Sequence, residues 1–161
     1  IILFAILGLQ LSKAQQGSVE VGQAAPYFEF RSFDGEVITQ ADMQGKVIVL
    51  NFWASWCKPC ELEAADLEAA WRHYQSHDDV LFLGVDYVDT DIEGQAYLKK
   101  FDITYPNGPD YGTAISQAFR TQGVPETYII DREGIIRAVK IGPFASYDEI
   151  IRTIDAVVKS P

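Results

Sequence analysis

Two cysteines, Cys57 and Cys60, are the only thiol side chains in the chain, and two residues separate them. At this spacing two thiols close a small disulfide ring and reopen it with little backbone movement. The pair follows the apolar run 47–53, typical of a buried strand, and a helical pattern begins at Lys58. Cys57 is therefore expected at a helix N-terminus, where backbone N–H groups and the helix dipole lower a thiol pKa. These residues predict reversible dithiol chemistry.

The residues around the two cysteines fit that chemistry. Pro59 falls in the first helical turn, where its missing N–H costs nothing and its ring stiffens the loop. The lysine before it adds a cation that favours the thiolate. Trp56 and residues 53–55 are expected to form an apolar rim, which makes Trp56 and Pro59 candidate substrate contacts. Cys57 is the predicted attacking thiol, and Cys60, deeper in the helix, is the predicted resolving thiol.

The helix that starts here has one face that should be buried. Apolar and aromatic residues recur on it at helical spacing, namely Leu67, Ala70, Trp71 and Tyr74. Extended towards the N-terminus, the same stripe contains Glu63 and Cys60. A carboxyl group there is expected to have a raised pKa and to exchange protons near neutrality. The alternative is that Glu63 reaches solvent or complements the helix N-terminus. Glu61 and Glu68 lie off the stripe and are expected to be solvated.

Other uses of a cysteine pair find less support in the sequence. Covalent haem attachment needs a histidine directly after the second cysteine, where Glu61 stands, and a zinc ribbon needs a second cysteine pair. A peroxide-reducing cysteine of the peroxiredoxin type expects a threonine three residues upstream, where Ala54 stands. One class of copper chaperones places three residues between its thiols and adds a nearby histidine. A thiol peroxidase, a non-catalytic metallochaperone and an inert disulfide are the alternatives, and no cofactor or metal is expected.

Composition bounds the class of protein. The chain has 161 residues, 48% of them hydrophobic, which is enough for one globular domain with its own core. Its net charge of −10 and the lack of a basic cluster exclude a nucleic-acid binder. Two cysteines supply neither a disulfide scaffold nor a four-thiolate zinc site.

An apolar segment precedes the domain. Residues 1–11 are almost wholly apolar, whereas a membrane span needs about 20 such residues. Because the sequence has no initiator methionine, residues 1–14 are interpreted as a truncated signal peptide or membrane anchor, with a candidate cleavage site after Ala14. A buried helix is the alternative. Residues 15–25 would form a polar linker and residues 26–160 the domain, which would lie outside the cytoplasm.

The rest of the pattern predicts an α/β domain with helices on both faces of its sheet. An Asp34-Gly35 turn predicts a β-hairpin at the start of the domain. The hairpin strands are expected at 27–31 and 36–38, further strands at 47–53, 80–87, 127–131 and 135–141, and helices at 58–76, 93–101, 113–120 and 146–159.

Two motifs resemble those of one protein superfamily. The sequence WASWCKPC, residues 53–60, resembles the active-site motif of the thioredoxin superfamily. The sequence GVPETYIID, residues 123–131, is similar to the signature of membrane-tethered, extracytoplasmic thiol-disulfide oxidoreductases of the ResA, TlpA and CcmG/DsbE type. The resemblance implies a thioredoxin-like fold, with a central mixed sheet flanked by helices, an N-terminal β-hairpin and a central insertion before the second motif.

The resemblance also implies an activity. Proteins of this group exchange disulfides with partner proteins outside the cytoplasm, and we expect reduction of the partner here. Apocytochrome c, in cytochrome c maturation, is one expected substrate, and a membrane thiol reductant is the expected electron donor. Thioredoxins carry a buried aspartate at the position of Asn51, which cannot titrate, whereas the ResA-like group carries a glutamate at the position of Glu63. Glu63 is therefore expected to handle the proton of Cys60.

Val124 and Pro125 are similar to the cis-proline loop that faces the disulfide in this group. A cis bond before Pro125 would leave the Val124 backbone free to pair with an extended substrate segment. A trans proline that merely starts an edge strand is the alternative.

Overall fold

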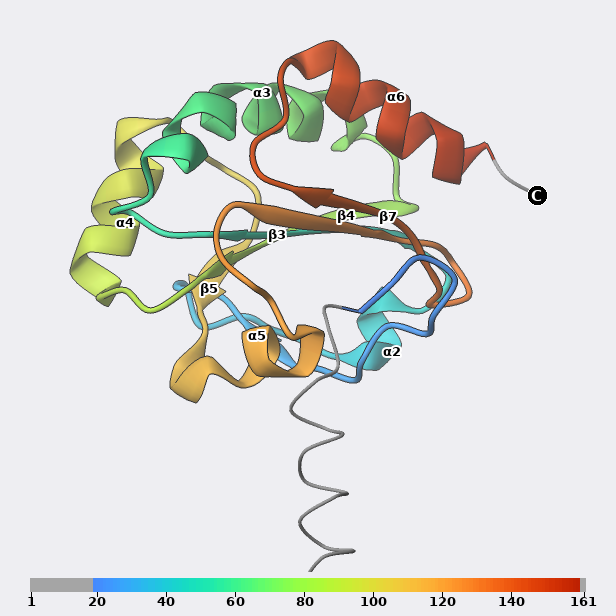
Figure 1. Ribbon diagram of the computed structural model, residues 1–161, viewed down its shortest axis with the longest axis horizontal. Helices are drawn as coiled ribbons and strands as arrows, with labels where there is room; N and C mark the ends of the chain where they lie inside the picture. Colours follow the sequence, from blue (N-terminus) through green and yellow to red (C-terminus); the bar gives the residue numbers. More distant parts are fainter. Residues whose placement is uncertain (1–18, 160–161) are drawn as a thin grey trace, which may run out of the picture.

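A five-stranded mixed β-sheet forms the centre of the computed structural model, which describes residues 19–159 (Figure 1). Its strands are β3 (Val47–Trp53), β4 (Val80–Asp86), β5 (Asn107–Pro109), β6 (Glu126–Ile130) and β7 (Ile136–Ile141). The order across the sheet is β5-β4-β3-β6-β7. β5, β4 and β3 are parallel, whereas β6 runs antiparallel to β3 and β7 antiparallel to β6. The expected mixed sheet is confirmed.

Helices cover both faces of the sheet, as the sequence pattern predicts. α3 (Lys58–Tyr74) and α6 (Tyr147–Val158) lie together on one face (Figure 1). α2 (Gln40–Met43) and α5 (Ala114–Phe119) lie on the opposite face (Figure 1). A 3₁₀ turn (Tyr111–Thr113) precedes α5, and α4 (Asp91–Lys100) packs beside the start of α3. The expected N-terminal hairpin is also present, formed by β1 (Phe30–Arg31) and β2 (Val37–Ile38).

The central strand β3 is buried along its whole length because side chains from both layers cover it. Successive side chains of a strand point to opposite faces, and β3 follows this rule. Val47 and Val49 pack with residues of α3 and α6, whereas Ile48, Leu50 and Phe52 pack with the opposite layer. The near-continuous apolar run in the sequence is therefore the signature of a strand covered on both sides.

Two short elements were not expected from the sequence. α2 is a single turn, whose capping box pairs the backbone and side chain of Thr39 with Asp42. β5 consists of Asn-Gly-Pro, residue types that are depleted in strands. It forms because residues 107–109 pair in parallel with the end of β4, and because the hairpin lies against Gly108, where an added Cβ would be 2.0 Å from the Arg31 carbonyl oxygen.

The expected central insertion lies between β4 and β6 and contains α4, β5, the 3₁₀ turn and α5. The expected linker packs on the domain where it is described: Val19 is buried, and Ala24 forms a β-bridge with Ile135. The signal-peptide or anchor segment 1–14, residues 15–18 and the domain end at residue 160 lie outside the described residues. No helix within residues 19–159 has the length and apolar character that a membrane crossing requires.

Candidate active site

Cys57 and Cys60 form a disulfide bond at the start of α3, with their Cα atoms 5.3 Å apart. Cys57 is the N-cap of the helix, and its Sγ accepts the backbone N–H of Cys60 at 3.1 Å. Pro59 lies in the first turn, as expected, and is exposed. Both cysteines are buried by their surroundings. The sulfur that caps the helix thus faces backbone donors and the positive end of the helix dipole, an arrangement that favours a thiolate once the bond is open.

The prediction that residues 53–56 form an apolar rim beside the disulfide is only partly correct. Trp56 is 57% exposed, but Trp53 and Ala54 are buried. The Trp53 indole N–H donates to Asn107 Oδ1 at 2.8 Å, and its ring stacks on Tyr97 at a centroid distance of 4.5 Å. Trp53 is buried because β5 and α4 cover the end of β3. Its side chain therefore packs beneath the disulfide turn instead of facing a partner protein. Trp56 alone of these side chains presents a large apolar surface beside the disulfide.

The Val124–Pro125 peptide bond is cis, so the alternative of a trans proline is wrong. Val124 packs against the cluster of buried side chains that contains both cysteines. Pro125 is buried, and its carbonyl oxygen accepts the N–H of Gly142 at 2.9 Å. Among the described residues, no hydrogen bond is made by the N–H or the C=O of Val124. This backbone is therefore free to bond with an extended chain that lies over the disulfide.

Glu63 lies on the buried face of α3, one turn after Cys60, with an exposed fraction of 1%. Its Oε1 accepts a hydrogen bond from Asn51 Nδ2 at 3.0 Å, and its Oε2 accepts the backbone N–H of Phe144 at 2.8 Å. Burial raises the pKa of Glu63 to about 7, against the two hydrogen bonds, which favour the charged form. The expected burial and raised pKa are present, and the alternative of a solvent-reaching carboxylate is wrong.

Asn51 connects this carboxyl group to the neighbouring strand. Its register places it opposite Thr127 of β6, and its side-chain amide donates to Thr127 Oγ1 at 2.9 Å as well as to Glu63. Asn51 is buried and carries no ionisable group. A neutral donor at this position holds the Glu63 carboxylate in place.

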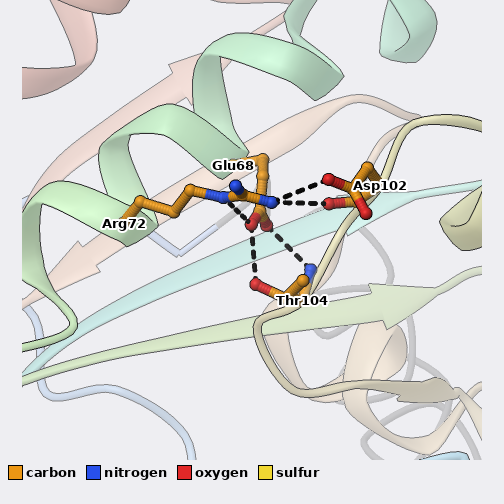
Figure 2. A network of polar contacts seen from close by, with 4 residues as sticks. All are labelled: Glu68, Arg72, Asp102 and Thr104. Carbon is orange, nitrogen blue, oxygen red and sulfur yellow. Dashed lines mark hydrogen bonds and ion pairs between the residues drawn. The ribbon is translucent and has the colours of Figure 1, made fainter.

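The expectation that Glu68 is solvated is wrong. Glu68 is buried, and its carboxylate accepts the Thr104 N–H at 2.8 Å, the Thr104 hydroxyl at 2.6 Å and Arg72 Nε at 2.7 Å (Figure 2). Arg72 also bonds Asp102 Oδ2 at 2.8 Å. The chain between α4 and β5 covers this side of α3, so a residue off the apolar stripe is still enclosed. Glu61 is only partly exposed and forms ion pairs with Lys58 and Lys100.

Sequence reasoning missed the groups that reach the site from distant parts of the chain. Phe144, in the connection between β7 and α6, supplies a backbone donor to Glu63 from 81 residues away. Asp89, in the loop after β4, accepts the N–H of Ser55 at 2.6 Å. The only available signal for Asp89 was its place in the loop three residues after a buried strand, and Phe144 had none.

Comparison with known proteins places this site in a family. Residues 21–139 match the model of the AhpC/TSA family. The chain belongs to this family. The thiol-disulfide oxidoreductase ResA of Bacillus cereus is 30% identical to this AhpC/TSA member over 145 residues, which cover 88% of the chain and 83% of ResA. The thioredoxin-like protein YneN of Bacillus subtilis is 31% identical over 134 residues, which cover 81% of the chain and 76% of YneN.

A solved structure extends the comparison to the fold. The thiol:disulfide interchange protein of the thioredoxin family from Chlorobium tepidum TLS superposes on this AhpC/TSA member with a TM-score of 0.77 and 25% identity. The match covers 88% of this chain and 99% of that one. The fold is thioredoxin-like, and with the Cys57–Cys60 pair at disulfide distance the protein is a thiol-disulfide oxidoreductase of the ResA type. The alternative of a non-catalytic metallochaperone is therefore set aside.

Proposed function

We propose that this protein reduces disulfides in partner proteins outside the cytoplasm. The observation that carries the proposal is the buried Glu63, held on the same helical face as Cys60 with a pKa of about 7. A dithiol reductant must deprotonate its second, shielded thiol in every turnover. A neighbouring carboxylate that binds a proton near neutrality meets that need.

The reaction begins at Cys57. Its thiolate attacks one sulfur of the partner's disulfide, a bond forms between the two sulfurs, and the partner's other sulfur leaves as a thiolate. The helix N-terminus stabilises the attacking thiolate, and Cys57 Sγ faces the N–H of Cys60 in the oxidised state.

The second step releases the partner. The Glu63 carboxylate accepts the proton of the Cys60 thiol, and the Cys60 thiolate attacks Cys57 Sγ of the mixed disulfide. The Cys57–Cys60 bond forms, and the partner leaves with both of its sulfurs reduced, having received two electrons. Asn51 and the Phe144 backbone keep the Glu63 carboxylate aimed while it gains and loses its proton.

The partner would dock beside the disulfide on Trp56, Pro59, Val124 and Pro125. Trp56 and Pro59 are exposed next to Cys57, and the free backbone of Val124 offers hydrogen bonds to an extended segment. β-Augmentation of this kind binds main chain rather than particular side chains, so it suits a partner whose disulfide lies in an unfolded or extended stretch.

The proposed location outside the cytoplasm rests on the apolar N-terminal sequence and on the family resemblance. Residues 1–14 would direct or tether the chain, and residues 26–160 would form the domain beyond the membrane. A membrane dithiol protein would return two electrons to the Cys57–Cys60 disulfide after each turnover. Apocytochrome c, whose haem-binding thiols must be reduced before haem attachment, is the proposed substrate, and cytochrome c maturation the proposed process.

Trapping with a Cys60→Ser variant tests the proposal. Without the resolving thiol, the full-length protein in its native membrane should accumulate a mixed disulfide through Cys57, and mass spectrometry of the trapped complex names the partner. Cys57→Ser is the matched control and should trap nothing. Accumulation with Cys57→Ser, or no complex with Cys60→Ser, would refute the assignment of the two sulfurs.

A further inference from the structure

The loop after β4 holds the active-site turn in place from outside the helix. We refer to residues 87–90 as the clamp loop. Three hydrogen bonds join it to residues 53–56: Tyr87 N–H to the Trp53 carbonyl at 2.8 Å, the Trp56 indole N–H to the Val88 carbonyl at 3.1 Å, and Ser55 N–H to Asp89 Oδ2 at 2.6 Å. The turn that ends in Cys57 is thus bonded to the clamp loop at three of its four residues.

The clamp loop keeps an unfavourable backbone conformation to make these contacts. Val88 has a φ of 48°, in the left-handed region that β-branched residues rarely adopt, and its side chain is exposed. Such a conformation persists only where the surroundings fix it, and it is enriched at functional sites. Here Asp89 fixes it on one side, since its second oxygen accepts the Thr90 N–H at 2.8 Å and Thr90 caps α4.

A second carboxyl group lies beneath the clamp loop. Asp86, at the end of β4, is 2% exposed, and its carboxyl group lies within hydrogen-bonding reach of the Asp89 carboxyl group. Two carboxyl groups this close form a hydrogen bond only when one carries a proton. Asp86 Oδ1 is buried and accepts no hydrogen bond from the described residues. The other oxygen, Oδ2, lies close against α4, where a Cβ added to Gly94 would be 2.2 Å from it.

The surroundings assign the shared proton to Asp86. Burial, and next the negative charge of Asp89, raise the pKa of Asp86 to about 8. Partial burial opposes a low pKa for Asp89, but the hydrogen bonds from Ser55 lower it below its usual value. At neutral pH, Asp86 therefore donates to the ionised Asp89, which in turn accepts from Ser55.

The charged groups that face Asp86 from the packed elements reinforce this state. Asp91 and Glu93 of α4 act on it in the same direction as Asp89. On the β5 side, the Asp110 N–H bonds the Asp86 carbonyl oxygen, while the Asp110 carboxylate is occupied by backbone N–H groups of α5. The register neighbour on β3, Trp53, is uncharged.

We propose that Asp89 is a positioning residue for thiol-disulfide exchange, and that the proton shared between Asp86 and Asp89 controls its hold on the active-site turn. Loss of that proton at alkaline pH places two carboxylates side by side, which weakens the Asp89–Ser55 bond and frees the Trp56 indole from the clamp loop. The expected effect on the rate of disulfide exchange rests on the proposed role of Cys57 as the attacking thiol. The expected change in the contacts of the active-site turn concerns the disulfide form alone and does not depend on that role.

Tryptophan fluorescence of the oxidised full chain tests the structural part, because no thiol titrates in that form. Between pH 6 and 9.5 the emission of Trp56, taken as wild type minus Trp56→Phe, should change with a midpoint near pH 8. The subtraction removes any change that the titration of Glu63 near pH 7 causes in the other tryptophans. Asp86→Asn should abolish the change in Trp56 emission, since an amide donates to Asp89 at every pH. Asp91→Asn removes a nearby exposed carboxylate that raises the pKa of Asp86, so the transition should remain and its midpoint should move to lower pH. A flat Trp56 profile, or a transition that survives in Asp86→Asn, would overturn the proposal.

The rate at which dithiothreitol reduces the Cys57–Cys60 disulfide tests the functional part. At pH 7, Asp89→Ala should react about tenfold more slowly than wild type, equivalent to about 1.4 kcal/mol, with Asp91→Asn unchanged. Asp89→Asn keeps one acceptor for Ser55 and should recover most of the rate. Wild-type kinetics in a folded Asp89→Ala would overturn the positioning role. If Asp89→Ala does not fold, the fluorescence of Asp86→Asn decides. Since the fluorescence experiment does not depend on which sulfur attacks, its failure and that of the Cys60→Ser trap are distinguishable.

Discussion

Replacing Glu63 by glutamine should change how the stability of the oxidised protein depends on pH. A carboxyl group whose pKa is higher in the folded state than in the unfolded chain stabilises the fold fully below its unfolded pKa, and this contribution is lost as the pH rises through its folded pKa. For Glu63 that window runs from 4.5 to about 7. The difference of about 2.5 pKa units corresponds to about 3 kcal/mol of unfolding free energy, which wild type loses across the window and the glutamine variant does not.

Urea unfolding of the disulfide form at pH 4 to 8 measures this difference. The free energy of unfolding of Glu63→Gln minus that of wild type should rise by about 3 kcal/mol between the two ends. The amide of glutamine will meet the donor of either Asn51 or Phe144, where the carboxylate offered an acceptor to both. That cost does not depend on pH, so it shifts the whole curve and leaves its slope unchanged.

Glu61→Gln is the matched control because Glu61 lies on the same helix with its carboxyl group in ion pairs. The hydrogen bonds from Lys100 and Lys58 lower the pKa of Glu61, so its contribution has the opposite sign: it is present above its usual pKa and lost as the pH falls. Glu61→Gln should therefore show no gain over wild type as the pH rises. A rise of less than about 1 kcal/mol for Glu63→Gln, or one equal to that of the control, would refute the account of the buried carboxyl group.

Other predictions concern packing and chemistry elsewhere. Alanine inside a helix is usually more stabilising than glycine by about 1 kcal/mol. Gly94→Ala should nevertheless lower the free energy of unfolding in urea by about 2 kcal/mol, because the added Cβ would clash with the buried Asp86 carboxyl group. A more stable variant would contradict this close approach. Glu68→Ala should cost about 3 kcal/mol, since it leaves buried donors without an acceptor. Arg72→Ala should lower the free energy of unfolding by less than about 1 kcal/mol, because Arg72 is half exposed. Equal losses for Glu68→Ala and Arg72→Ala would show that the ion pair, rather than the burial of Glu68, stabilises the protein. The reduced protein should consume hydrogen peroxide no faster than a small free thiol, because the buried Ala54 offers no hydroxyl beside Cys57; rapid turnover would favour the peroxidase alternative.

The parts of the site that sequence could predict are those set by local periodicity. Cys57 and Pro59 are placed by the strand-to-helix junction, and both are where the pattern predicts them. Glu63 was identified because it is one turn from Cys60 and one turn from Leu67 on the buried stripe. A helix turns by a constant angle at each residue, so one buried position determines the others on its face.

The parts that could not be predicted depend on segments far away in the sequence. Glu68 is off the stripe, and only the chain around Thr104 encloses it. β5 has no strand propensity of its own and exists because β4 offers it an edge. The contact between Asp89 and Ser55 spans 34 residues, and a side chain that follows a buried strand gives no indication of its partner. Tertiary contacts override local preference at each of these positions.

The hydrogen bond from the Phe144 backbone to Glu63 has a consequence for synthesis of the chain. Translation proceeds from the N-terminus, so the cysteines emerge 84 and more residues before Phe144 and the helix α6 that follows it. Until α6 docks, the chain has both thiols but lacks one of the two donors that hold the carboxylate. The surroundings of the disulfide are therefore completed last, and an unfinished chain carries its two thiols before the Glu63 carboxyl group has both of its hydrogen bonds.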